Sequence, residues 1–183
     1  MSPFPGQPQR NPPRIELIPR VRRNDAFTAV SISQSSLAYE KASVIFNIGS
    51  TLSSLSSASP RSPESLKRTF NSLRQAQGMF IYINDNFLHA PSTDLSREVV
   101  KVLVTLMEAQ GTEIFLENMA QVGENGKGAA LRAKVSITAS SLYSGIVEEC
   151  KEWVTKDVFI KEWSLLVQVC LVLPPPRAIL TTA

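Results

Sequence analysis

The sequence predicts an all-α fold of long helices that pack as antiparallel neighbours in a bundle or helical-repeat layer. Pro91 is the single proline between residues 64 and 173, which leaves long windows in which helices can propagate. Apolar residues in these windows recur at intervals close to 3.6 residues, the period of an α-helix. No alternation of apolar and polar residues is long enough to predict more than minor strands.

The first predicted helix covers about residues 35–55. Its apolar residues follow the helical period and are Leu37, Val44, Ile48 and Leu52. The helix fades into a serine-rich segment, whose hydroxyl groups compete for backbone hydrogen bonds, and Pro60 ends it.

The second helix is predicted to begin at Ser62-Pro63-Glu64, which supplies an N-cap hydroxyl, a proline in the first turn and an acid near the positive end of the helix dipole. Its apolar stripe consists of Leu66, Phe70, Leu73, Phe80, Ile83 and Phe87. The segment Pro91–Asp94 has the same type of start signal. A third stripe follows it to about Gln121 and consists of Leu95, Val99, Val102, Leu106 and Ile114.

A glycine-rich segment, 123–128, is predicted to be a turn before the last two helices. The fourth helix carries a stripe of Leu131, Val135, Thr138, Leu142 and Ile146. The fifth carries Phe159, Trp163, Leu166 and Cys170. Proline returns in the triplet 174–176, so we expect residues 171–183 to form a loose C-terminal tail.

The positive charge of the chain is concentrated at its N-terminus. The formal net charge is +3, but five arginines and one glutamate before residue 24 give that segment +4 and leave −1 for the rest. Six of the twelve prolines also precede residue 20, so residues 1–23 are predicted to be a loose arm rich in proline and arginine. A body without a basic face argues against nucleic-acid binding. Contact with a membrane is expected to be peripheral at most, because the longest apolar stretch is far shorter than a membrane span.

Composition indicates a globular protein of a reducing compartment. Hydrophobic residues make up 43% of the chain and charged residues 19%, which excludes a wholly disordered polymer. The two cysteines, Cys150 and Cys170, form neither a disulfide framework nor the spacing of a zinc site. No secretory signal is visible in the N-terminal residues, so we expect a cytoplasmic location.

No residue pattern predicts an enzyme. Lys127 lies among glycines, but a phosphate-binding loop needs a different spacing and a preceding strand. His89 is the only histidine and lies between two predicted helices, which favours a surface turn over a catalytic triad. The glutamates at 148, 149 and 152 share a helix with Lys151, which favours a solvated face. We therefore expect no catalytic residue, cofactor or metal ion.

Three collinear segments carry a family resemblance. The segment Ser36–Gly49, SLAYEKASVIFNIG, closely resembles the signature helix of the Bro domain, the helical domain of Alix-like, ESCRT-associated proteins. Segments ending at Ile83 and spanning Asn86–Ser96 follow in the family's order, and the latter resembles the fungal vacuolar-sorting branch most strongly. Residues 24–170 are accordingly interpreted as a partial Bro domain.

The resemblance implies a tetratricopeptide-like solenoid layer with a concave face. In the family, that face accepts the amphipathic C-terminal helix of an ESCRT-III subunit, and apolar residues of two neighbouring helices line it. The matching positions here are Phe115, Leu131 and Val135. The implied function is a non-catalytic adaptor in endosomal and vacuolar protein sorting, recruited to multivesicular bodies, with a deubiquitinating enzyme as a further partner of the full-length family.

Two alternative functions stay open at the level of sequence. The chain could be a Bro-domain scaffold in ambient-pH signalling or in a Rho-effector pathway, or a truncated fragment that cannot bind. The sequence also departs from the family pattern where Gly111 and Thr112 replace an Ala-Gln pair. A glycine inside a helix costs about 1 kcal/mol relative to alanine. Because a helical layer cut on both sides exposes apolar faces, we expect marginal stability or self-association.

Overall fold

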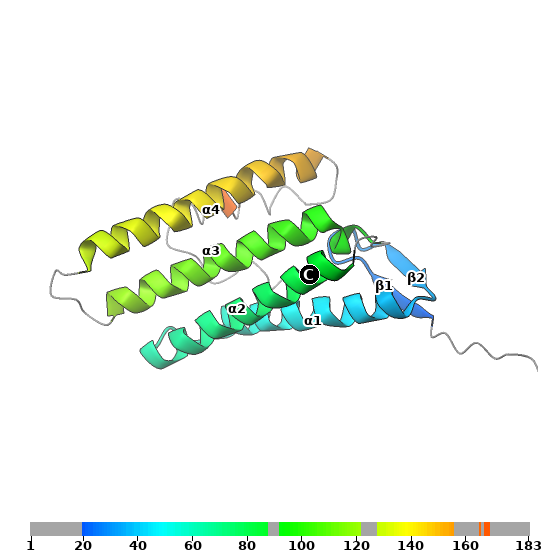
Figure 1. Ribbon diagram of the computed structural model, residues 1–183, viewed down its shortest axis with the longest axis horizontal. Coiled ribbons are helices and arrows are strands. Elements are labelled where there is room, and N and C mark those ends of the chain that lie inside the picture. The colour runs from blue at the N-terminus through cyan, green and yellow to red at the C-terminus, as the bar shows by residue number, and fades with distance from the viewer. Residues whose placement is uncertain (1–19, 88–91, 122–127, 156–164, 166, 169–183) are drawn as a thin grey trace, which may run out of the picture.

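The computed structural model describes residues 20–87, 92–121, 128–155, 165, 167 and 168. Four long helices account for most of this part of the chain: α1 (Leu37–Ala58), α2 (Pro63–Asn86), α3 (Arg97–Gln121) and α4 (Ala129–Thr155). They lie side by side in sequence order, so α2 packs against α1 and α3, and α3 packs against α4 (Figure 1). The predicted all-α fold is confirmed.

A short β-hairpin precedes the helices. Strand β1 (Val21–Asn24) pairs antiparallel with strand β2 (Ser31–Gln34). Two strands of four residues agree with the prediction that strands are at most minor. The position of β1 corrects the prediction that residues 1–23 form a loose arm, because the fold already includes the last residues of that segment. Residues 1–19 lie outside the described part of the chain.

Buried polar contacts hold the hairpin to the 3-10 turn η1 (Thr93–Leu95). Arg23 forms an ion pair with Asp94, whose side chain is fully buried. The backbone N–H of Ala26 donates to the same carboxylate at 2.9 Å, and the backbone N–H of Asp94 donates to Asp25 Oδ2 at 2.9 Å. Breaking one partner of a buried pair leaves an uncompensated charge, so these contacts fix the hairpin on the helical layer.

The start of α2 and the central core follow the sequence predictions, whereas α3 begins at Arg97, after η1, and not at the predicted start in Pro91–Asp94. The Ser62 hydroxyl caps α2 by accepting a hydrogen bond from the backbone N–H of Ser65 at 3.3 Å, and Pro63 occupies the first turn. The predicted stripes of α2 and α3 form the core between these helices. Its buried members are Leu66, Leu73, Phe80, Ile83, Leu95, Val99, Val102, Leu106 and Ile114.

The buried face of α1 differs from the predicted one. Leu37, Val44 and Ile48 are 72%, 52% and 42% exposed. The face that meets α2 instead consists of Tyr39, Ala42, Ser43, Phe46, Gly49, Ser53 and Ser56. Most of these side chains are small, so they let the two helix backbones approach closely, and Phe46 packs edge-on against Phe80 with ring centroids 5.6 Å apart.

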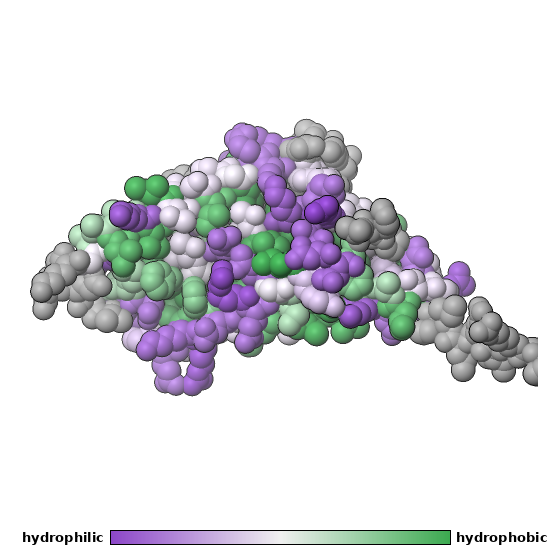
Figure 2. All heavy atoms as spheres, viewed as in Figure 1, coloured by the Kyte–Doolittle hydropathy of each residue, from purple (hydrophilic) through white to green (hydrophobic). Residues whose placement is uncertain are grey.

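One face of the molecule mixes hydrophobic and hydrophilic residues on its surface. On the face presented in Figure 1, hydrophobic residues form separate patches between hydrophilic ones (Figure 2). None of the described helices combines the length and apolar character needed to cross a bilayer.

Helix α4 buries the face that consists of Ala139, Tyr143, Ile146, Val147 and Cys150. Of its predicted stripe, Ile146 is buried, whereas Leu131 is 52% exposed. The predicted fifth helix falls largely outside the described residues, although Val167 is helical and buried. His89 and residues 123–127 of the predicted turn also lie outside the described part.

Candidate partner-binding groove

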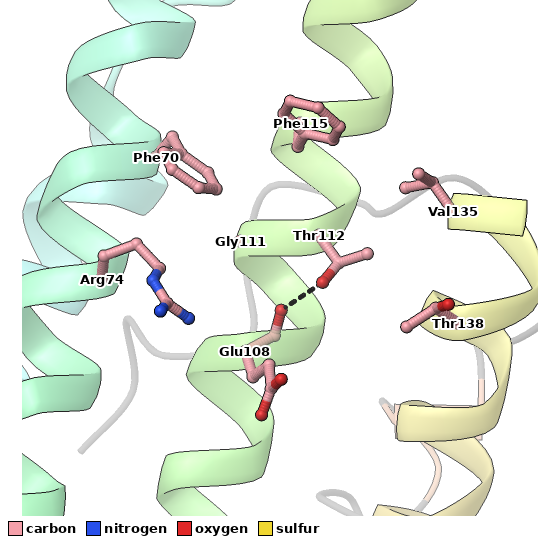
Figure 3. A pocket seen from close by; sticks show the side chains of 8 residues that line it. All are labelled: Phe70, Arg74, Glu108, Gly111, Thr112, Phe115, Val135 and Thr138. Carbon is pink, nitrogen blue, oxygen red and sulfur yellow. Dashed lines mark hydrogen bonds between the residues drawn. The ribbon is translucent and has the colours of Figure 1, made fainter. Parts of the chain in front are cut away.

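An open groove runs over α3 between α2 and α4 (Figure 3). Its volume is about 290 Å³. The residues that line it are Phe70 and Arg74 from α2, Glu108, Gly111, Thr112 and Phe115 from α3, and Val135 and Thr138 from α4. Each helix contributes residues three or four positions apart, the spacing that places side chains on one helical face.

One end of the groove is apolar. The rings of Phe70 and Phe115 lie with their centroids 6.2 Å apart, and Val135 faces Phe115 from α4 (Figure 3). Phe115 is 40% exposed, whereas other α3 residues such as Met107 and Ile114 are buried in the core. An exposed aromatic ring between apolar neighbours is a typical anchor point for a protein partner.

Gly111 forms part of the floor of the groove beside Phe70. A Cβ atom at this position would lie 3.9 Å from Phe70 Cε2, which is ordinary van der Waals contact. The missing side chain therefore relieves no clash. Because glycine has no side chain, the groove stays open at Gly111, between its apolar and its polar end.

The other end of the groove is polar and charged. Arg74 Nη1 donates to Gln77 Oε1 at 2.6 Å, and Gln77 Nε2 donates to Glu108 Oε2 at 3.3 Å. Gln77 is 6% exposed, whereas Arg74 and Glu108 are exposed. A buried amide thus connects a cation on α2 with an anion on α3.

The residues predicted from the family resemblance lie at the apolar end. Phe115 and Val135 line the groove, which brings them together from α3 and α4. Leu131 does not line it, but lies one turn before Val135 on α4 and is exposed. No residue of this set is sealed inside the fold.

Sequence reasoning missed the α2 side of the groove. Phe70 was assigned to the core stripe, and it does lie on that face of α2 as a half-buried residue. Arg74 and Glu108 gave no signal, because an exposed charge on a helix is ordinary. Their relation depends on the packing of α2 on α3, which helical spacing alone does not supply.

A carboxyl group lies between α3 and α4 close to the groove. The pKa of Glu113 is raised to about 7, mainly by burial and also by the nearby charge of Glu117, although a hydrogen bond from Tyr143 and the charge of Arg61 oppose this rise. Tyr143 Oη donates to Glu113 Oε2 at 2.7 Å. Since a phenol can donate to a neutral or an ionised carboxyl group, the contact persists in both protonation states.

Glu148 and Glu149 of α4 form ordinary surface ion pairs. Lys151 Nζ lies 2.7 Å from Glu148 Oε1, and Lys101 Nζ lies 3.0 Å from Glu149 Oε1. Among the described residues, no group of three His, Cys, Asp or Glu side chains could hold a metal ion. The groove is therefore the feature of the described chain that calls for a functional explanation.

Comparison with known proteins identifies relatives of most of the chain. The family model described as BRO1-like domain matches residues 23–172. Vacuolar protein-sorting protein BRO1 of Cryptococcus neoformans is 49% identical over 147 residues, which cover 80% of this chain and 15% of that protein. Its counterpart in Gibberella zeae is 51% identical over 146 residues, which cover 79% and 14%. The chain thus spans about 15% of the length of these curated relatives.

Solved structures share the fold. The ALIX BRO1 CHMP4C complex matches with a TM-score of 0.70 and 24% identity, over 80% of this chain and 41% of that one. The Bro1 domain of a structure that concerns endosomal targeting matches with a TM-score of 0.69 and 26% identity, over 78% and 39%.

Proposed function

We propose, because the chain belongs to the BRO1-like domain family, that it acts as a non-catalytic adaptor in endosomal and vacuolar protein sorting. Its groove binds the C-terminal amphipathic helix of an ESCRT-III subunit and recruits the chain to endosomes. The full-length protein to which such a domain belongs has a deubiquitinating enzyme as a further partner, which co-precipitation of the longer protein would test.

The exposure of Phe115 carries this proposal. An aromatic ring in the centre of a helical layer would normally be covered, yet Phe115 is 40% exposed between Phe70 and Val135. A groove between parallel rows of helical side chains fits another helix, which inserts apolar residues at intervals of three or four positions. A protein with the same fold, ALIX BRO1, is known in complex with CHMP4C, which supports a helix of this class as the occupant.

Replacement of Leu131 by aspartate tests the proposal. Leu131→Asp places a charge beside the apolar end of the groove, where a bound helix would desolvate it. We expect affinity for a fluorescein-labelled ESCRT-III C-terminal peptide to fall at least about tenfold, measured by fluorescence anisotropy.

Ile137 provides a matched control on the same helix. It is 70% exposed and lies about 200° around the helix from the groove residue Val135, so Ile137→Asp should leave the affinity unchanged. Equal affinities for the Leu131→Asp variant and the unchanged chain, with equal helical circular dichroism, would contradict the proposal.

A further inference from the structure

We propose that Arg74 selects the partner helix and sets its direction by pairing with a carboxylate one turn from the partner's apolar anchor. This inference rests on the proposed function and names the chemistry of the partner. The groove is asymmetric, with Phe70, Phe115 and Val135 at one end and Arg74 and Glu108 at the other (Figure 3). A helix that enters in the wrong direction aligns its apolar residues but misplaces its charges.

Arg74 and Glu108 differ from the other close charges of the described chain. Arg61–Glu117, Arg68–Glu64 and Lys101–Glu149 are direct ion pairs. Arg74 and Glu108 face the same groove, yet among the described residues they are joined only through the amide of Gln77. Within the described residues, neither side chain is held in a direct ion pair, so each can take up a charged partner in the groove.

Gln77 holds this arrangement in place. Its side chain is almost fully buried, and its amide accepts from the guanidinium on one side and donates to the carboxylate on the other. A guanidinium has five N–H donors, and the amide uses one of them in this contact. The others are available for a carboxylate, which the planar guanidinium can bind with two parallel hydrogen bonds.

The spacing along α2 fixes where the partner's carboxylate must lie. Arg74 follows Phe70 by four residues, which is about 6 Å along the helix axis. A partner helix whose apolar side chain contacts Phe115 must then carry its acid three or four positions away, on the side that faces α2. A lysine at that position would meet Arg74, and an acid that faces α3 would meet Glu108, so both are disfavoured.

A charge-reversal experiment tests this inference on the full chain. The probe is the labelled ESCRT-III C-terminal peptide, together with versions in which each acidic residue is changed in turn to lysine. We expect Arg74→Glu to weaken binding of the original peptide roughly five- to tenfold. One lysine-substituted peptide should weaken binding to the unchanged chain and restore binding to Arg74→Glu, and this coupling should decrease as salt increases.

Arg68→Glu is the matched control, because Arg68 lies on the same helix, is exposed and pairs only with Glu64 among the described residues. It should change affinity less than about twofold. If Leu131→Asp removes binding but Arg74→Glu behaves like Arg68→Glu, the inference is overturned and groove binding stands. If no reversed peptide restores binding to Arg74→Glu, the inference also fails. If the unchanged chain binds no peptide, the proposed function fails and the inference fails with it.

Discussion

Gly49 determines how closely α1 approaches α2. A Cβ atom at this position would lie 3.0 Å from Cε1 and Cζ of Phe80 and 3.4 Å from Met79 Cβ. Phe80 cannot easily move away, because its ring is buried and packs edge-on against Phe46. The close contact thus depends on the absence of a side chain at one position.

We therefore expect Gly49→Ala to destabilise the protein. Overpacking costs typically about 1–3 kcal/mol and outweighs the gain of about 1 kcal/mol in helix propensity. Urea denaturation should show a free energy of unfolding lower by up to about 2 kcal/mol.

Gly78 in α2 provides the comparison, since a Cβ atom there meets nothing within 4 Å. Gly78→Ala should raise the free energy of unfolding by up to about 1 kcal/mol. Equal effects of the two substitutions would refute the role assigned to Gly49.

At the scale of elements, the protonation of Glu113 between α3 and α4 affects the stability of the fold. Its pKa in the folded protein is about 7, against 4.5 for an ordinary glutamate, so the folded state binds the proton more tightly. Between these two values the stability falls as pH rises, because ionisation places a charge in a partly buried site. Below pH 4.5 the carboxyl group is protonated in both states and causes no loss.

Glu113→Gln should remove this dependence. The amide oxygen can still accept the hydrogen bond from Tyr143, and it carries no charge. We expect the variant to be more stable than the unchanged chain above pH 7, by on the order of 1–3 kcal/mol, and similar to it at pH 4.5. Thermal denaturation at a series of pH values checks this, and parallel curves for both proteins would argue against it.

How much of each element the sequence predicted depends on its residue types. Helices α2 and α3 carry bulky residues on their buried faces, so their period identified both the helices and the core. Apart from Tyr39 and Phe46, the buried face of α1 is made of alanine, serine and glycine, whereas Leu37, Val44 and Ile48 are exposed. Hydrophobicity alone therefore selected the wrong face, because close helix packing favours small residues.

Contacts between distant residues account for what the sequence did not reveal. Arg23 and Asp94 are 71 positions apart, so nothing local showed that the hairpin belongs to the fold. Phe115 and Val135 were predicted from the family resemblance and not from local pattern. The matches to the BRO1-like family confirm the resemblance itself. Gln77 and Glu108, 31 positions apart, meet only once α2 and α3 are packed.

At the scale of the whole molecule, α1 presents an apolar stripe that no described element covers. Leu37, Val44, Ile48 and Leu55 are between 42% and 72% exposed and recur at helical spacing. Exposed apolar side chains along one helix face promote association in water. The prediction of self-association thus gains a specific location on α1, away from the groove over α3.

We expect the chain to self-associate at micromolar concentrations through this stripe. The double substitution Val44→Glu and Ile48→Lys places a favourable i, i+4 charge pair on the exposed face, so it should shift the chain toward the monomer with little change in melting temperature. Sedimentation velocity measures the shift, and Ile137→Asp on the exposed side of α4 is the control, which should leave the association unchanged. Peptide binding should survive in the double variant, because neither position lines the groove. A chain that is already monomeric across this concentration range would disprove the role of α1 in association, while leaving the groove proposal intact.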